Sequence, residues 1–258
     1  MENKRFGYFR GTVWEKCFQK LNENSDKIEI IKKFISICLE NKISVDFRDQ
    51  RNYKKGWGND IPYNSVIHCY YNGNRILYLN ITRVKQKIAF KKVNDKFQVE
   101  SEPTGELNNT NINEIIKKKK SKVDGYNKNN ELSRQFKYMQ KPDDNIVWID
   151  HQIIFHRKDR DAQSDKCGRF DAVYYNNKKN EFVLVEFKNK ENKKDNPVVQ
   201  VDSYLKAIDI LLKEHFIKEL CKIASIKNKF KILKISDDIL KKMNRSNKLN
   251  AEVIKLEN

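Results

Sequence analysis

The sequence lacks the features that place a protein in a membrane or direct it out of the cell. It contains no run of about 18 apolar residues, the length that a membrane-spanning helix needs. The segment from Met1 to Phe6 is polar overall and has no apolar stretch of the secretory type. We therefore expect a cytoplasmic protein with no membrane partner.

Closely spaced cysteines are also absent. Structural zinc sites need ligand pairs at short spacing, and disulfide frameworks are typical of small secreted chains with an even cysteine count. This chain satisfies neither condition, which predicts reduced and mostly buried thiols. Its five cysteines are far apart in the sequence, at Cys17, Cys38, Cys69, Cys167 and Cys221.

Basic residues, in contrast, are in large excess. Lysine and arginine number 53 against 35 acidic residues, so the formal net charge is +18. A field of this sign attracts polyanions, of which nucleic acid is the obvious candidate. Lysine, asparagine and isoleucine are abundant throughout the chain, as expected if an AT-rich genome set the composition. The charge therefore fits nucleic-acid binding, and it also fits an interaction protein whose basic character mirrors genome composition.

Residues 1–100 carry the patterns of a small α+β domain. Apolar residues at helical spacing predict a helix over 26–41. A hairpin is predicted over 65–82, because two apolar runs flank the tight-turn signal Asn72-Gly-Asn. A second hairpin is expected over 87–99. We expect this domain to serve recognition or regulation.

Residues 101–130 are polar, rich in asparagine and interrupted by proline and glycine. This composition predicts a linker or long loop. The run from Lys117 to Lys120 within it is either a solvated stretch or a track for a phosphate backbone.

Residues 131–258 alternate between helical and extended patterns, which predicts an α/β domain around one sheet. Helices are expected over 131–139 and over 198–220, the second with Pro197 in its first turn. Strands are expected over 146–155, 170–175, 182–188, 230–235 and 252–256.

Two of these strands flank a polar turn at 176–180, which predicts an antiparallel hairpin. A centred turn places Asp171 opposite Glu186, and opposed side chains share one face about 5 Å apart at Cβ. Side-chain alternation puts Lys188 on the same side as Glu186. Two carboxylates and a lysine thus converge at one end of the hairpin. The same register pairs two apolar couples, Tyr175 with Phe182 and Val173 with Leu184.

Facing carboxylates repel each other and are costly to desolvate unless a cation neutralises them. Oxygen ligands of this kind suit Mg²⁺ or Mn²⁺, and the backbone carbonyl of Phe187 offers a further ligand. Lys188 would then orient or deprotonate a water, or stabilise charge on a phosphate. The alternative is an ordinary ion pair at a strand end. The apolar run 182–185 weighs against it, because it marks a buried strand in which stray charges are disfavoured.

Together these residues resemble the signature of the PD-(D/E)xK nuclease superfamily, whose fold is restriction-endonuclease-like. The match is Asp171-x14-Glu186-x-Lys188, within the local sequence Gly168-Arg-Phe-Asp. Gln200-Val-Asp-Ser-Tyr204 is similar to the Gln-x-x-x-Tyr motif of the RecB-like branch. The resemblance covers roughly residues 131–236. It departs from the signature in having no proline before Asp171.

The resemblance implies phosphodiester hydrolysis by a metal-activated water. On this interpretation Asp171 and Glu186 hold the metal, and Glu131, which opens a helix upstream, completes the metal site. Lys188 positions the nucleophile. Glu131 also suits a first helical turn simply because its charge interacts well with the helix dipole.

Further residues are candidates for the catalytic site or for contacts with nucleic acid. Gln200 and Tyr204 lie one helical turn apart on one face, where they would place the scissile backbone or Lys188. A core role is the alternative for Tyr204. Basic and aromatic residues near the catalytic strand and in the loop 48–57 are expected to bind the backbone, although the rings of that loop would also suit packing on the first domain. These candidates are Lys190, Lys193, Lys194, Arg169, Arg51 and Trp57.

We therefore expect an α/β protein. Its domain 1–100 is α+β, 101–130 is a basic linker, and 131–258 is a nuclease domain with a mixed sheet flanked by helices. The expected activity is metal-dependent cleavage, with DNA favoured over RNA, and a role in host defence or restriction suits a small nuclease. A homodimer is expected if both strands are cut. The open alternatives are an RNA-cleaving nuclease and a catalytically silent nucleic-acid-binding module of the same fold.

Overall fold

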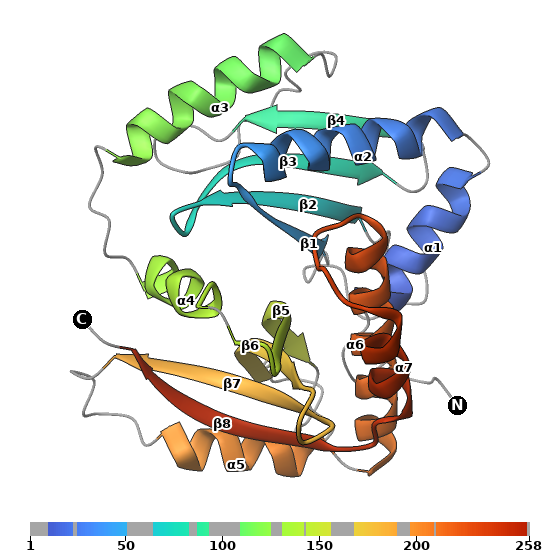
Figure 1. Ribbon diagram of the computed structural model, residues 1–258, viewed down its shortest axis with the longest axis vertical. Coiled ribbons are helices and arrows are strands. Elements are labelled where there is room, and N and C mark those ends of the chain that lie inside the picture. The colour runs from blue at the N-terminus through green and yellow to red at the C-terminus, as the bar shows by residue number, and fades with distance from the viewer. Residues whose placement is uncertain are drawn as a thin grey trace, which may run out of the picture. The chain divides into compact units, whose positions relative to one another are not determined.

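The computed structural model describes residues 10–22, 25–50, 64–82, 87–92, 109–124, 131–141, 143–155, 168–189, 197–208 and 210–256. The chain divides into two compact units. The C-terminal unit comprises Met1–Thr12, Tyr138–Asn228 and Leu233–Asn258, and the N-terminal unit comprises Val13–Lys137 and Lys229–Ile232. Each unit contains a four-stranded sheet and helices (Figure 1), so the expected α/β class is confirmed.

The sheet of the N-terminal unit is an antiparallel meander of four strands in the order β1-β2-β3-β4. The expected hairpin forms between β2 and β3, with Asn72 and Gly73 both at positive φ in its turn. Gly73 is needed here because an added Cβ would lie 2.4 Å from the backbone nitrogen of Ser133. The strands are β1 (Ser44–Gln50), β2 (Asn64–Tyr71), β3 (Asn74–Thr82) and β4 (Lys87–Lys92).

The helices of this unit are α1 (Arg10–Asn22), which begins in the C-terminal unit, α2 (Ser25–Glu40), α3 (Asn109–Asp124) and most of α4 (Glu131–Met139). The predicted helices over 26–41 and 131–139 are confirmed as α2 and α4. The predicted second hairpin is seen only through β4, which pairs with β3, because residues 93–100 lie outside the described residues.

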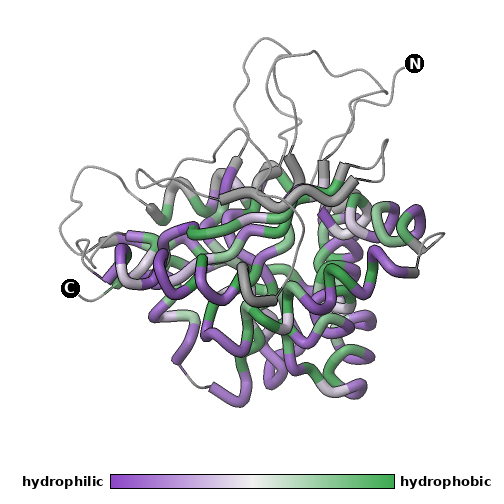
Figure 2. Tube along the Cα trace, turned by 90° about the horizontal axis from the view of Figure 1, so that it is seen from above, coloured by the Kyte–Doolittle hydropathy of each residue, from purple (hydrophilic) through white to green (hydrophobic). Residues whose placement is uncertain are grey.

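The segment expected to be a linker or long loop contains helix α3, so that prediction was wrong for residues 109–124. The apolar residues Ile112, Ile115, Ile116 and Val123 recur at helical spacing and are buried. The surrounding lysines and asparagines hid this pattern, and the lysine run from Lys117 to Lys120 lies on the helix. Figure 2 shows hydrophobic and hydrophilic residues alternating along helices.

The C-terminal unit contains a mixed sheet of four strands in the order β5-β6-β7-β8. The first three strands pair antiparallel, and β8 runs parallel to β7. A parallel neighbour requires a crossover connection, which three helices supply between β7 and β8. These elements are β5 (Ile146–Phe155), β6 (Gly168–Asn176), β7 (Glu181–Asn189), α5 (Pro197–Ala207), α6 (Ile210–Lys229), α7 (Asp237–Arg245) and β8 (Leu249–Leu256).

Two predictions for this region were wrong. The helix expected over 198–220 is divided into α5 and α6, and the N–H of Ile208 closes the end of α5 with a bond of 3.1 Å to the carbonyl of Leu205. The strand expected over 230–235 is a turn, with Lys231 at φ 58°. Apolar alternation suggested a strand there, but the segment instead follows α6 directly, and the side chain of Asn228 accepts from the N–H of Ile235 (2.9 Å).

Four cysteines lie in the described residues, where all are buried thiols outside any disulfide, as expected, and Cys167 lies outside the described residues. The thiols of Cys38 and Cys69 approach to 3.6 Å within the N-terminal unit. Burial raises the pKa of the Cys69 thiol well above its usual value.

None of the described helices is long and apolar enough to cross a membrane.

Candidate active site

The hairpin of β6 and β7 forms in the register that the sequence predicts. Tyr175 pairs with Phe182, and Val173 pairs with Leu184. The turn is stabilised by Asn176, whose side-chain oxygen accepts from the N–H groups of Lys178 (3.1 Å) and Lys179 (3.0 Å). Local turn chemistry therefore fixes the register, and the register fixes which side chains share a face.

The backbone pairing of β6 and β7 runs as far as Ala172 opposite Val185 and stops one residue before Asp171 and Glu186. Beyond that point the carboxylate Oδ2 of Asp171 accepts a hydrogen bond of 2.8 Å from the backbone N–H of Phe187. Asp171 is 7% exposed and Glu186 is 6% exposed. Two buried carboxyl groups thus stand where the two strands part.

The two carboxyl groups lie on the face of the sheet opposite to an apolar cluster. Ala172 and Phe187 belong to that cluster, and side chains alternate along a strand, so their neighbours Asp171, Glu186 and Lys188 point the other way. Phe187 stacks on Trp148 at 6.1 Å between ring centroids and meets Tyr138 edge-on at 5.6 Å. These contacts hold the segment that carries Glu186 and Lys188.

The environment of Glu186 disfavours the charged form of its carboxyl group. Burial, followed by the charge of Asp171, raises the pKa of Glu186 to about 7. Lys188, whose Nζ lies 3.2 Å from Oε1 of Glu186, and Arg169 lower the pKa of Glu186 only in part. The nearby cations therefore do not neutralise the carboxyl pair, and a further positive charge would be favoured there.

Helix α5 contacts β7 and β8 and carries the Gln-x-x-x-Tyr residues. The ring of Tyr204 meets the ring of Phe170 at 5.3 Å in a T-shaped arrangement, and Phe170 directly precedes Asp171. The structure therefore brings the helix with this motif against the strand that carries Asp171. Gln200 lies on α5, one turn before Tyr204.

Of the remaining predicted site residues, the structure describes Glu131 and Arg169 but not the other five. Glu131 is the exposed first residue of α4 in the N-terminal unit, and its Oε1 accepts from Nε2 of Gln135 at 3.4 Å. Arg169 is exposed on β6 and is close enough to lower the pKa of Glu186. Predictions for Lys190, Lys193, Lys194, Arg51 and Trp57 fall outside the described residues.

The C-terminal unit also contains a buried ionic cluster that the sequence did not predict, formed by Arg10, Asp150 and Lys227. These residues come from α1, β5 and α6, so no spacing pattern links them. The one local signal was an aspartate within the apolar stretch of β5, where an unpaired charge would be disfavoured.

No protein-family model, curated protein or solved structure matches this chain.

Proposed function

We propose that the protein is a metal-dependent nuclease that hydrolyses phosphodiester bonds, with DNA as the favoured substrate. The observation that carries the proposal is the pair of buried carboxyl groups of Asp171 and Glu186, with Lys188 beside them, where β6 and β7 part. The mixed sheet and the position of α5 against β6 support the proposed restriction-endonuclease-like fold.

The donor set suits a divalent cation. The carboxylates of Asp171 and Glu186 are hard oxygen ligands. Burial, and after it the charge of Asp171, raises the pKa of Glu186, and a bound cation would offset both effects. The carbonyl of Phe187, between Glu186 and Lys188, is a third oxygen donor. When bound, Mg²⁺ or Mn²⁺ would lower the pKa of a coordinated water and neutralise charge on a phosphate.

Four further side chains would contact the water or the nucleic acid in this proposal. Lys188 is 20% exposed, so its ammonium group can meet a ligand from solvent while remaining in contact with Glu186. From there it would orient the attacking water or donate to a phosphate oxygen. Gln200 and Tyr204 would help to place the scissile backbone, and the exposed Arg169 would meet a neighbouring phosphate.

Nucleic acid is the proposed substrate because the chain carries a net charge of +18 and α3 presents exposed lysines. DNA is favoured over RNA through the resemblance alone. A single site of this kind cuts one strand, so cleavage of both strands would require a homodimer. A role in host defence or restriction is the context that we propose for such an enzyme.

The proposal is tested by incubating plasmid DNA, single-stranded DNA and RNA with the protein in Mg²⁺, Mn²⁺ or EDTA. Wild type is compared with Asp171→Asn, Lys188→Ala and the control Lys178→Ala, which removes an exposed lysine from the turn of the same hairpin. We expect metal-dependent cleavage by wild type and the control, and none by the two site variants.

Two other outcomes would change the conclusion. Cleavage that survives equally in Asp171→Asn would place the active site elsewhere. Tight binding of nucleic acid by all four proteins without cleavage of any substrate would favour the catalytically silent binding module.

A further inference from the structure

Strand β5 is irregular where it passes the residue proposed to hold the metal. Its pairing with β6 shifts register between Trp148 and Asp150, and Gln152 adopts a left-handed backbone with φ 48°. His151 pairs with Ala172 and Ile153 pairs with Phe170. Gln152 is therefore the residue of β5 that stands opposite Asp171.

A left-handed conformation is unfavourable for a residue with a side chain, and it persists only where the surroundings hold it. In β5, two buried cationic side chains, Arg10 and Lys227, contact the segment around Gln152. Arg10 is 2% exposed and Lys227 is 3% exposed. Each approaches the segment Ile149–Gln152 of β5 from a different helix, and both bind the carboxylate of Asp150.

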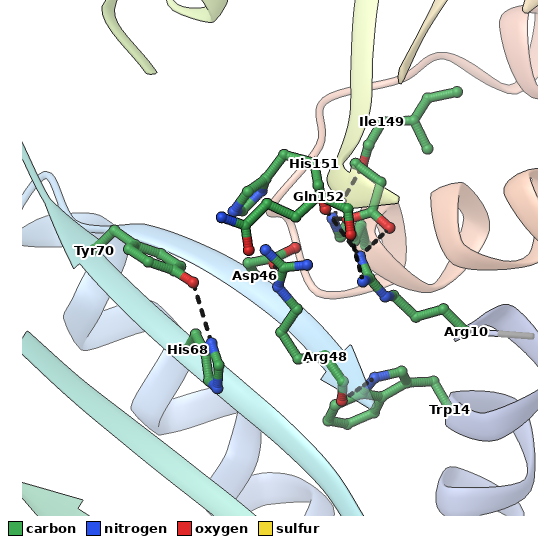
Figure 3. Close-up of polar contacts among 11 residues, drawn as sticks. Arg10, Trp14, Asp46, Arg48, His68, Tyr70, Ile149, His151 and Gln152 are labelled. Carbon is green, nitrogen blue, oxygen red and sulfur yellow. Dashed lines mark hydrogen bonds and ion pairs between the residues drawn. The ribbon is translucent and has the colours of Figure 1, made fainter. Parts of the chain in front are cut away.

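The two cations contact different parts of this segment, and Figure 3 shows Arg10 pointing toward His151 and Gln152. Arg10 donates to the Asp150 carboxylate and to the carbonyls of His151 (3.2 Å) and Gln152 (3.3 Å). Lys227 donates to Oδ1 of Asp150 (2.8 Å) and to the carbonyl of Ile149 (2.9 Å). Arg10 is thus the cation bound to the residue opposite Asp171.

Arg10 is itself held in place by α6. The backbone N–H of Thr12 donates to Oε2 of Glu219 at 2.7 Å, and the hydroxyl of Thr12 donates to Oε1 of the same carboxylate. Gly11 lies so close to α6 that an added Cβ would be 2.5 Å from the carbonyl oxygen of Glu219. The start of α1 therefore has a fixed position in the C-terminal unit.

We propose that Arg10 is a positioning residue of the active site. By binding the carbonyl of Gln152, it fixes the backbone of β5 opposite Asp171 and so holds the Asp171 carboxylate in the orientation that binds metal. Only arginine suits this task, because its planar guanidinium can donate to several acceptors at once, whereas the lysine ammonium is a compact charge. This inference rests on the proposed nuclease site.

The test compares Arg10→Lys, Arg10→Met and Lys227→Met in the 258-residue chain. Both methionine variants leave Asp150 with one buried cation, so they are matched in charge, but only the Arg10 variants lose the contact with Gln152. Binding of Mn²⁺ is measured by calorimetry without substrate, and the Mg²⁺ concentration for half-maximal cleavage is measured with DNA. All assays are run well below the unfolding midpoint of each variant.

We expect the Arg10 variants to weaken Mn²⁺ binding on the order of tenfold, the size of effect seen when groups that orient metal ligands are removed. Lys227→Met should lower the unfolding midpoint and leave Mn²⁺ affinity unchanged. Gln152→Gly, introduced into Arg10→Lys, should recover part of the affinity, because glycine adopts positive φ without strain. A purely structural role for Arg10 would not produce this recovery of metal affinity.

Two results would overturn the inference. One is unchanged Mn²⁺ affinity in folded Arg10→Lys, and the other is an equal loss in Arg10→Met and Lys227→Met. If wild type binds Mn²⁺ and cleaves DNA in either case, the proposed function stands and only the role of Arg10 is lost. If wild type itself neither binds Mn²⁺ nor cleaves, both proposals fail together.

Discussion

The carboxylate of Asp171 accepts a hydrogen bond of 2.8 Å from the backbone N–H of Phe187, at the point where the pairing of β6 and β7 ends. Asp171 therefore has two functions that can be separated experimentally. It satisfies a buried backbone donor, and in the proposed function it would offer its other oxygen to a metal. Phe187 is in turn held in the apolar cluster of the C-terminal unit, so the donor has a fixed position.

We expect Asp171→Asn and Asp171→Ala to abolish cleavage alike but to differ in stability. The asparagine oxygen can still accept from the N–H of Phe187, whereas alanine leaves this buried donor unsatisfied, at a cost of about 1–3 kcal/mol. Urea unfolding of the two metal-free variants measures the difference. Equal stability would show that the hydrogen bond to Phe187 contributes nothing to the folded state.

Glu186 should make the stability of the metal-free protein fall as pH rises. Its pKa is raised from 4.5 to about 7 in the folded protein. Below pH 4.5 the Glu186 carboxyl is protonated in both the folded and the unfolded protein, so it does not lower the free energy of unfolding. Between the two values only the unfolded chain releases the proton, and the folded state becomes progressively less favoured until the penalty is complete above the folded pKa.

Replacing Glu186 with glutamine removes this titration. We expect metal-free Glu186→Gln to be more stable than wild type at about pH 8 and to lose that advantage at about pH 4, where both forms of the site are neutral. Thermal unfolding in EDTA measures the comparison. Mg²⁺ at the higher pH should stabilise wild type and not the variant. A constant difference in stability at both pH values would contradict the raised pKa.

The hairpin of β6 and β7 could be predicted from the sequence because the residues that determine its register lie within the hairpin itself. A polar turn between two alternating strands sets the register, and the register places Asp171 opposite Glu186. The buried cluster around Asp150 could not be predicted in this way. Arg10 and Asp150 are 140 positions apart in the chain, and nothing in either local sequence specifies the other.

The errors in predicted secondary structure have a related cause. In α3 the lysines and asparagines outnumber the buried isoleucines, so composition suggested a loop although the helical spacing was present. The region 198–220 has one continuous helical pattern in the sequence, but the chain bends at Ile208 and forms two helices. Tertiary packing decides such breaks, and intrinsic propensity predicts them weakly.

Lys188 should act on the rate of cleavage more than on metal binding. We expect Lys188→Ala to lower kcat by about a hundredfold or more, because a positioned proton-transfer or charge-stabilising group contributes about 10²–10⁴-fold. The calorimetric affinity for Mn²⁺ should change much less than in Asp171→Asn. Because Lys188 lowers the pKa of Glu186, its removal should also shift the pH dependence of stability to higher pH. Loss of Mn²⁺ binding in Lys188→Ala would make the lysine a structural partner of Glu186 instead.

Tyr204 combines a packed ring with a hydroxyl that the Gln-x-x-x-Tyr motif would use. Its ring contacts Phe170 at 5.3 Å. We expect Tyr204→Phe to retain stability and to lose activity, whereas Tyr204→Ala should lose activity together with about 1 kcal/mol of stability from the aromatic contact. Cleavage rates and urea unfolding of both variants measure this. Full activity in Tyr204→Phe would assign the residue to the core alone.

The exposed lysines of α3 provide a test of nucleic-acid binding that is independent of catalysis. Lys117 and Lys118 are neighbouring and exposed, on a helix whose opposite side buries Ile112, Ile115 and Ile116. If they contact phosphates, the slope of log affinity against log salt should become shallower by about 0.9 for each lysine replaced by glutamine on duplex DNA. The matched control is Lys241 and Lys242, an adjacent exposed pair on α7. Binding is measured in EDTA, where no cleavage is expected. Equal changes in slope for both pairs would show that net charge, and no particular surface of α3, governs binding.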